Sequence, residues 1–566
     1  MKYSELADVY EKLENTSARL KKTDIIAELL KKTPTHELEK LVLLLSGRIF
    51  PIWSEEETGV ANQIMIQAIA KSSGIDGSAV NKAYKKIGDL GKVAEEFCES
   101  KKQKTLFKKT LDIDKVYENM LKIASQGGKG SQDRKISLIV ELLSQSNSKE
   151  AKYIVRIVLE ELRIGVAEGV IRDSIAKAFG VNKKIVEDAW FLRPDYGIIA
   201  EIAKEKGERG LKMLEVEIGV PIKVQLAERS PNLKTALESF ENPTLECKYD
   251  GMRTIIEKDD DKIWIFTRRM ENVSSAFPDL VELCKKYIKA KRCIIDGETI
   301  AIDPKNGRPL PFQKLSERIK RKYNIHETIK EIPIQINLFD IIYLDEKKLF
   351  DLPLYERREI LKNNIKIFPD KFQIVKSLTT NNLKLAENFY KEALQNGHEG
   401  LIVKNLEAKY VSDRRVAGGW LKVKPIMETL DLVITGATWG AGKRTGWFGS
   451  FMLSCRNPKT GEFLECGMLG TGIKEKKSNE NDITFDYMTK LLKPYIEHEQ
   501  GNQIKIKPKI VIEVAYEEIQ KSPTYKSKYA LRFPRFIRLR HTERSAEEAD
   551  TINRVEHLYR NQKGKK

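Results

Sequence analysis

A cluster of ionisable residues lies near the middle of the chain, in the segment ECKYDGMR. If TLECKY is an extended strand, its period of two places Glu246, Lys248 and Asp250 on one face, and Cys247 and Tyr249 on the other. The plain interpretation is a strand that ends in a hairpin, because Asp-Gly is a strong turn signal. The alternative is that Lys248 is a nucleophile, because three ionisable groups beside a tight turn are costly unless they line a charged or wet pocket.

Further charges stand at the ends of the β-like runs downstream: Arg268 after KIWIFT, Glu298 after a predicted Asp-Gly turn in IIDGE, Glu399 before GLIVK, Lys404 at its end, and Lys422 and Lys424 along WLKVK. Such a set suits a nucleoside triphosphate. Cations neutralise phosphates, and one or two carboxylates hold a divalent cation or a ribose hydroxyl. Phe339 in NLFD is the candidate for stacking on the base.

Other chemistries fit the sequence less well. GAGKRT resembles a phosphate-binding loop, but it lacks the upstream glycine and the Ser or Thr after the lysine. The six histidines stand in no recognisable nucleophile context, so lysine chemistry is favoured. The six cysteines form no CxxC pair, which argues against a zinc site and a disulfide framework and indicates a reducing compartment.

The elements that must position these residues fall into three parts. Up to about residue 220 the pattern is almost wholly helical, and from 221 short β-branched and aromatic runs alternate with a few helices. After Pro425 the runs DLVITGATWG, SFMLSCRN, EFLECGML and IVIEVAYEEI predict a small all-β domain. We therefore expect a multidomain protein with a helical domain at 1–220, an α+β domain at 221–425 and an all-β domain at 426–566.

One segment of the helical part, SKEAKYIVRIVLEELRIG, shows the pattern well. Ser148 is the candidate N-cap and Gly165 the predicted end of the helix. Arg156 and Arg163 are seven residues apart and would share one face. They are interpreted either as a basic edge that faces DNA or as ordinary solvated arginines.

The charge balance points to a polyanionic partner. Lys and Arg number 100 against 82 Asp and Glu, a net charge of +18, and nucleic acid is the commonest such partner, although a lysine-rich solvated surface is the alternative. The amphipathic start MKYSELADVYEKLENTSARLKK is no secretory signal, and the apolar run 41–45 is too short to span a bilayer. We expect a cytoplasmic protein without a membrane segment.

The ordered series KYDGMR, FTRRMENVSSAFPDL, IIDGETIA, INLFD, HEGLIVK, WLKVK and LRFPRFIRLR resembles the signature of the covalent nucleotidyltransferases. Within that superfamily nearly the whole chain resembles the archaeal replicative type of ATP-dependent DNA ligase. The segments GGKGSQDRKISLIVELL and ELRIGVAEGVIRDSIAKAF resemble its helical DNA-binding domain. The closing EVAYEEIQKSPTYKSKYALRFPRF resembles its OB-fold domain. The part between them resembles the nucleotidyltransferase, or adenylation, domain.

The resemblance implies that Lys248 attacks ATP and becomes a lysyl-AMP, that the AMP passes to the 5′-phosphate at a nick in duplex DNA, and that the 3′-hydroxyl displaces it. Such an enzyme acts in replication, repair and recombination. The implied nucleotide contacts are Glu246 at the adenine amino group, Arg253 and Arg268 at ribose or phosphates, Glu298 at the ribose hydroxyl, Phe339 at the adenine face, the cations Lys422 and Lys424, and Arg532 and Arg535 at pyrophosphate. The implied magnesium ligands are Glu298 and Glu399.

Two assignments depend on shorter patterns. The family commonly has an arginine six residues before the first lysine of WLKVK; here that residue is Val416, so Arg415, or its neighbour Arg414, would serve instead. The run KKQKTLFKK resembles a sliding-clamp-binding peptide through Gln103, Leu106 and Phe107, with a basic linker as the alternative. A monomer is expected. An RNA ligase, a guanylyltransferase or a catalytically silent relative that binds DNA or a clamp remains an alternative.

Overall fold

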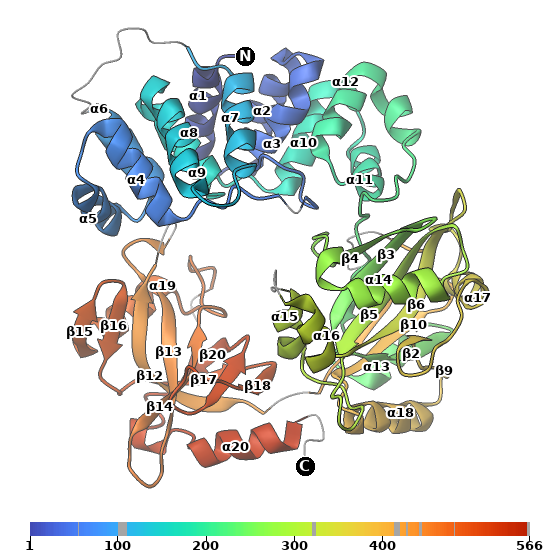
Figure 1. Cartoon of the computed structure of the whole chain (residues 1–566). Coiled ribbons are helices and arrows are strands. Elements are labelled where there is room, and N and C mark those ends of the chain that lie inside the picture. The colour runs from blue at the N-terminus through green and yellow to red at the C-terminus, as the bar shows by residue number, and fades with distance from the viewer. Residues whose placement is uncertain are drawn as a thin grey trace.

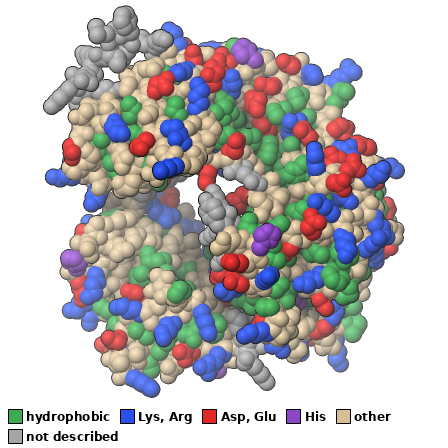
Figure 2. All heavy atoms as spheres, in the orientation of Figure 1, with side chains coloured by type: hydrophobic (Ala, Val, Ile, Leu, Met, Phe, Trp, Pro, Cys, Tyr) green, Lys and Arg blue, Asp and Glu red, His purple; other side chains and the backbone are tan. Residues whose placement is uncertain are grey.

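The computed structural model describes residues 1–54, 56–99, 110–319, 324–411, 419–425, 428–440, 444–479 and 482–562. These residues form a helical part, a mixed part with two sheets and a predominantly β part, arranged around a central gap in the ribbon view (Figure 1). In the space-filling view a hollow lies at the centre, between the helical part and the C-terminal part, while the helical and middle parts are in contact, for example through Phe191 and Phe350 (Figure 2). None of the helices among the described residues has the length and hydropathy that a bilayer span requires.

The helical part packs around one hydrophobic core whose buried side chains run from Tyr3 to Leu211. Its helices are α1 (Tyr3–Glu14), α2 (Arg19–Lys32), α3 (Leu38–Leu45), α4 (Asn62–Ser73), α5 (Gly77–Ile87), α6 (Leu90–Glu99), α7 (Ile113–Ala124), α8 (Ser131–Gln145), α9 (Ser148–Val158), α10 (Glu168–Phe179), α11 (Lys183–Leu192) and α12 (Tyr196–Lys212). The prediction of a helical first part is confirmed.

Helix α9 differs from its predicted limits at both ends. Its N-cap is Asn147, whose side chain accepts from the backbone N–H of Glu150 while the Glu150 carboxylate accepts from the N–H of Asn147. This reciprocal capping box satisfies two donors, so it outcompetes a cap by Ser148. The helix ends at Val158, because the backbone turns into the left-handed region at Glu160 and Arg163, each with φ of 57°.

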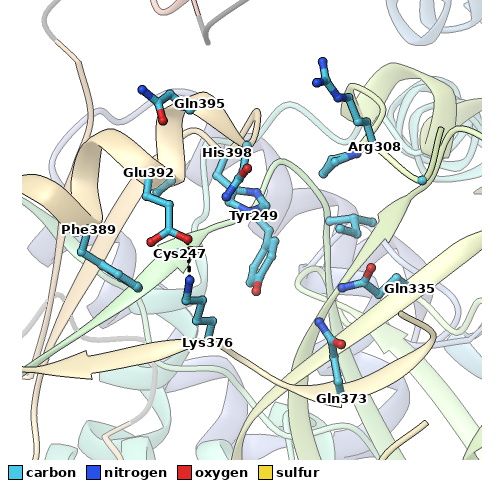
Figure 3. A pocket seen from close by; sticks show the side chains of 15 residues that line it. Cys247, Tyr249, Arg308, Gln335, Gln373, Lys376, Phe389, Glu392, Gln395 and His398 are labelled. Carbon is cyan, nitrogen blue, oxygen red and sulfur yellow. Dashed lines mark hydrogen bonds and ion pairs between the residues drawn. The ribbon is translucent and has the colours of Figure 1, made fainter. Parts of the chain in front are cut away.

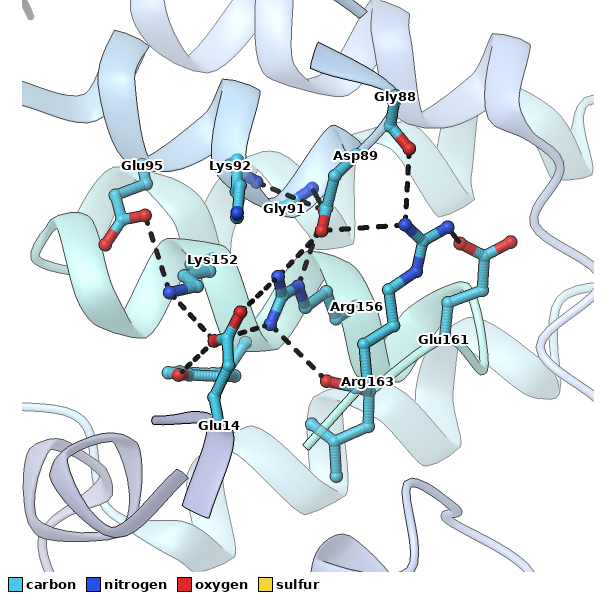
Figure 4. Close-up of polar contacts among 12 residues, drawn as sticks. Glu14, Gly88, Asp89, Gly91, Lys92, Glu95, Lys152, Arg156, Glu161 and Arg163 are labelled. Atoms are coloured by element: carbon cyan, nitrogen blue, oxygen red, sulfur yellow. Dashed lines mark hydrogen bonds and ion pairs between the residues drawn. The ribbon is translucent and has the colours of Figure 1, made fainter. Parts of the chain in front are cut away.

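The arginines of this segment also differ from the prediction, because they do not share one exposed face of a helix. Arg156 is only 2% exposed and forms ion pairs with Glu14 at 3.0 Å and Asp89 at 2.7 Å (Figure 4). Arg163 lies in the following loop, where it donates to the carbonyl of Gly88 at 3.2 Å. Both interpretations of Arg156 from the sequence are therefore wrong: it is neither a DNA-facing nor a solvated residue, but a buried cation between two carboxylates.

The middle part contains two sheets. The five-stranded sheet has the order β1-β11-β10-β2-β9, with β1 (Glu228–Arg229), β2 (Pro243–Lys248), β9 (Ser377–Thr379), β10 (Gly400–Asn405) and β11 (Trp420–Val423). The six-stranded sheet has the order β4-β3-β5-β6-β7 with β8 beside β6: β3 (Met252–Asp259), β4 (Lys262–Thr267), β5 (Arg292–Ala301), β6 (Ile334–Leu344), β7 (Lys347–Lys348) and β8 (Phe372–Ile374). Its helices are α13 (Leu233–Glu238), α14 (Pro278–Tyr287), α15 (Phe312–Ile319), α16 (Ile325–Glu331), α17 (Leu354–Asn364) and α18 (Leu383–Gln395).

The hairpin interpretation of the central segment is wrong, because β2 and β3 belong to different sheets. The turn at Asp250 and Gly251 carries the chain from one sheet to the other. A Cβ atom at Gly251 would lie 2.3 Å from the carbonyl oxygen of Thr299 in β5, so only glycine allows the connection to pass so close to that strand.

The second predicted Asp-Gly turn is also wrong. Asp296 and Gly297 lie inside β5, which pairs without interruption with β3 and shows a register shift against β6 between these two residues. A bulge inside a strand re-aims the side chains that follow it. Glu298, the next residue, is therefore delivered by a strand interior and not by a turn.

The C-terminal part packs around a core that includes Leu430 and Leu558. Its larger sheet has the order β14-β13-β12-β16-β15, and β17 pairs with both β12 and β20. The strands are β12 (Leu430–Trp439), β13 (Phe448–Arg456), β14 (Phe463–Leu469), β15 (Ile496–Gln500), β16 (Gln503–Ile506), β17 (Val511–Ala515), β18 (Glu518–Lys521), β19 (Tyr529–Arg532) and β20 (Arg535–Leu539), with the helices α19 (Phe485–Leu492) and α20 (Ile552–Asn561). The predicted fold class is confirmed.

Candidate active site

The centre of the site is an ion pair between Lys248 and Glu399. Strand β2 ends at Lys248, and the backbone N–H of Glu399 donates to the Lys248 carbonyl at 2.8 Å just before β10 begins. The antiparallel pairing of β2 with β10 therefore brings the two side chains together, and the Lys248 ammonium donates to Oε2 of Glu399. The Lys248 side chain is 23% exposed and that of Glu399 is 8% exposed, so the lysine can be reached from solvent while the carboxylate is largely shielded.

Two further cations complete this cluster from different parts of the chain. Lys424 Nζ lies 3.2 Å from Glu399 Oε2 and 3.1 Å from Glu517 Oε2. Arg532, at the end of β19, has its guanidinium 3.7 Å from Glu399 Oε1 and 3.6 Å from Asp250 Oδ1. The C-terminal part thus supplies a residue directly to the surroundings of Lys248 and Glu399.

A second cluster surrounds the buried carboxylate of Glu246. Lys404 Nζ lies 2.8 Å from Glu246 Oε2, 4.1 Å from the ring centre of Phe339 and 4.0 Å from that of Trp420. Arg358 of α17 forms an ion pair with the other oxygen of Glu246. Burial, together with the neighbouring charge of Arg358, holds the pKa of Lys404 well below its usual value.

A third buried group fixes Arg253. Its guanidinium makes two hydrogen bonds to Asp296, which also accepts from the Tyr410 hydroxyl at 3.0 Å. The same guanidinium lies 4.8 Å from the ring centre of Phe339 and 5.1 Å from that of Trp420. Burial alone would lower the pKa of Arg253, but the charge and hydrogen bonds of Asp296 outweigh it and raise the pKa.

Glu298 has an unusual electrostatic environment. Burial raises its pKa to about 7, Lys248 and Arg253 oppose the rise, and the negative charges of Glu399 and Asp296 add to it. The carboxyl is thus short of positive charge in this structure. A cationic ligand beside it would favour its ionised form.

The opposite face of β2 confirms the predicted alternation. Cys247 and Tyr249 line a cavity of about 320 Å³ that is also lined by α18 residues such as Phe389 and Glu392 (Figure 3). In that view Glu392 pairs with Lys376, at 2.5 Å. The charged residues of β2 and the cavity therefore lie on different sides of the strand, so the charged face is a distinct candidate site.

The remaining predicted residues have varied surroundings. Lys422 lies in the same row across the sheet as Glu246, with Ile402 of β10 between them, so these side chains share a face. Arg268 and Arg535 are exposed, and in the described part of the chain no ion pair joins either one to Glu399. The residues that fall outside the described ranges are Arg414, Arg415, Gln103, Leu106 and Phe107.

Three buried residues of the site were missed in the sequence: Asp296, Trp420 and Arg358. Asp296 was interpreted as a turn residue, although an acid within the apolar run RCIIDGETIA is a signal of a buried partner. Trp420 begins the recognised WLKVK run, and its aromatic character was a usable signal. Arg358 in ERRE looked like any charge of an exposed helix, and only the tertiary structure places it beside Glu246.

Comparison with known families agrees with this arrangement. Residues 224–424 match the ATP dependent DNA ligase domain, residues 2–176 the DNA ligase N terminus and residues 444–543 the ATP dependent DNA ligase C terminal region. The chain belongs to the ATP-dependent DNA ligase family. The prediction from the ordered motifs is thereby confirmed.

Relatives match over the whole length. The chain is 46% identical to a DNA ligase of Nanoarchaeum equitans, over 100% of this chain and 99% of the relative. It is 43% identical to a DNA ligase of Thermococcus onnurineus, over 99% of this chain and 98% of the relative. The solved structure "Pmar-Lig_PreS3" shares the fold, with a TM-score of 0.56 at 16% identity over 94% of this chain and 99% of that one.

Proposed function

We propose that the protein seals nicks in duplex DNA by forming a lysyl-AMP at Lys248 and then a 5′-adenylated DNA. The observation that carries this proposal is the position of Lys248, partly exposed at a strand end among Glu399, Lys424 and Arg532. The lysine amine must lose its proton before it attacks the α-phosphate. Glu399 is the carboxylate that already accepts from it, and it can orient the amine.

The flanking clusters would bind the rest of the nucleotide. Glu246 would accept from the adenine amino group while Phe339 lies against the base, and Arg253 would donate to ribose or phosphate oxygens. Lys422, Lys424, Arg268 and Arg415 would add positive charge for the phosphates. Arg532 and Arg535 would orient the pyrophosphate as it leaves, which is consistent with the contact between Arg532 and Glu399.

The donor set fits a magnesium ion that is also bound by substrate phosphates. Glu298 and Glu399 would hold it, and a cation beside Glu298 would offset the burial that raises the pKa of this carboxyl. Magnesium commonly takes only one or two protein carboxylates together with phosphate oxygens. Consistent with this, no group of three or more His, Cys, Asp or Glu side chains within the described ranges could form an all-protein metal cage. When bound, the ion would supply positive charge that stabilises the transferring phosphoryl group.

Nicked DNA would lie in the central hollow that the three parts border (Figure 2). A net charge of +18 supports a polyanionic partner. A monomer that binds a sliding clamp through Gln103, Leu106 and Phe107 completes the proposal, with roles in replication, repair and recombination. A pull-down with a purified clamp tests the clamp contact: the wild type should bind, and Phe107→Ala should bind more weakly.

The deciding experiment is incubation with α-labelled ATP and magnesium, followed by denaturing electrophoresis. The wild type should acquire a covalent label that chases into nicked DNA, and Lys248→Ala should acquire none. A wild type without label, or an equal label on Lys248→Ala, would refute the mechanism. Labelling by GTP would instead indicate a guanylyltransferase, and preference for an RNA nick an RNA ligase.

A further inference from the structure

The carboxylate of Glu246 is held in an unusual way. Glu246 is 2% exposed. Each of its two carboxylate oxygens forms an ion pair with a buried basic side chain: one with Lys404, which is 1% exposed, and the other with Arg358, which is 8% exposed. A buried ion pair needs only one cation for each carboxylate, and the extra charge costs desolvation energy. The carboxylate is thus held at both of its oxygens.

Arg358 reaches Glu246 from a helix, whereas the other residues of the cluster lie on the strands β2, β6, β10 and β11. It lies on α17, and its Nη1 lies 3.4 Å from the hydroxyl oxygen of Thr244, which itself accepts from Thr379 at 3.3 Å. Burial lowers the pKa of Arg358 to about 10, which still leaves it charged at neutral pH. The guanidinium is thus anchored on two residues of β2, Thr244 and Glu246.

Arg357, the preceding residue of α17, also forms a buried ion pair with a strand residue. Arg357 makes two hydrogen bonds to Asp340, at 2.8 and 2.9 Å, and both side chains are fully buried. Asp340 directly follows Phe339, the residue proposed to lie against the base. Helix α17 therefore fixes both the strand that carries Phe339 and the carboxylate of Glu246.

We propose that Arg358 is a positioning residue which, with Lys404, holds Glu246 ionised and oriented so that the site selects adenine over guanine. This inference rests on the proposed nucleotide site. The Glu246 carboxylate is an acceptor, the Lys404 amine beside it at 2.8 Å is a donor, and this pair would face the base. Adenine presents the complementary pair, an amino donor beside a ring-nitrogen acceptor.

Guanine presents a carbonyl oxygen where adenine has its amino group. Against that oxygen an ionised Glu246 is repulsive, so selectivity depends on the carboxylate staying charged and in place. Without Arg358, only Lys404 would hold the Glu246 carboxylate, so its position and charge would be less well fixed. A carboxylate that can turn away from the guanine carbonyl no longer opposes it, so discrimination would fall.

The test is single-turnover formation of lysyl-nucleotide by the full chain, with ATP and with GTP, for wild type, Arg358→Met and Arg358→Lys. We expect Arg358→Met to raise the KM for ATP by about 10- to 100-fold with a much smaller change in the maximal rate. The ratio of ATP to GTP efficiency should fall, and Arg358→Lys should restore part of it. Lys362→Met, which removes a half-exposed cation from the same helix, is the matched control and should behave as wild type.

Two results separate positioning from mere stability. Glu246→Gln should also lower the ATP to GTP ratio, and its combination with Arg358→Met should add little, because both act on one contact. An unchanged ratio in Arg358→Met, or full additivity, would overturn the inference. If Arg358→Met does not fold, Arg358→Gln decides, because it can still donate to Thr244 but has no charge: an unchanged KM and ratio would overturn the inference. A wild type that takes no label from ATP would instead refute the proposed function itself.

Discussion

Replacing Glu298 with glutamine should stabilise the protein while it impairs adenylation. The pKa of the Glu298 carboxyl is raised from 4.5 to about 7, first because of burial. A raised carboxyl pKa favours folding below the unfolded pKa, and this contribution is lost as the pH rises through the folded pKa. Since one pKa unit corresponds to about 1.4 kcal/mol, the charged form costs at most about 3 kcal/mol at pH 8, less where solvent screens it.

Glutamine resembles the protonated carboxyl and avoids that cost. The difference in unfolding free energy between Glu298→Gln and wild type should therefore be near zero around pH 4.5 and grow to about 2–3 kcal/mol by pH 8. Denaturant unfolding monitored by circular dichroism across this range measures it. Lysyl-AMP formation by the variant should be lost or strongly reduced at all pH values, because the proposed ribose and magnesium contacts are removed.

Glu257→Gln is the matched control. Glu257 lies on β3 outside the site, is fully buried, accepts from the Gly219 backbone N–H at 2.7 Å, and has its pKa raised to about 8 by burial. This variant should also gain stability with rising pH, yet keep wild-type adenylation. Equal stabilisation of Glu298→Gln at pH 4.5 and pH 8, or none at either, would refute the electrostatic reasoning.

Three further predictions concern other parts of the molecule. Arg156→Met should lower the free energy of unfolding by about 3–5 kcal/mol, because Glu14 and Asp89 lose a shared buried partner; Lys31→Met, which removes an exposed pair with Glu28, should change it by less than about 1 kcal/mol. Arg532→Ala should slow lysyl-AMP formation by about 10²- to 10³-fold but spare sealing of a pre-adenylated nick. Arg538→Ala, which loses only surface pairs with Glu513 and Glu543, should not slow it. Affinity for nicked duplex, measured by fluorescence anisotropy, should fall linearly with salt on a log–log plot, and a flat response would contradict the proposed DNA surface.

Local patterns predicted the strands that carry the site. The alternation in TLECKY separated Glu246 and Lys248 from Cys247, and the structure keeps them on opposite faces because side chains of a strand alternate. The limits of α9 were missed for an equally local reason, since a capping box at Asn147 outweighs the serine that follows it. The Asp-Gly pairs at 250–251 and 296–297 were both predicted wrongly. The same dipeptide occurs in a hairpin turn, in a connection between two sheets or in a bulge, depending on the neighbouring strands.

The sequence by itself determined the family and the order of the charged strand ends, and it predicted Lys248 as the nucleophile, because those depend on residue types at short spacing along the chain. Only the tertiary structure decided which partners each charge has. The helical pattern predicted Arg156 on the surface, but it is buried between two acids. Arg358 lies on a helix with no distinctive sequence pattern, yet it forms an ion pair with Glu246. The physical reason is that the energy of a charge depends on burial and on neighbours more than a hundred residues away, and neither is recorded in local periodicity.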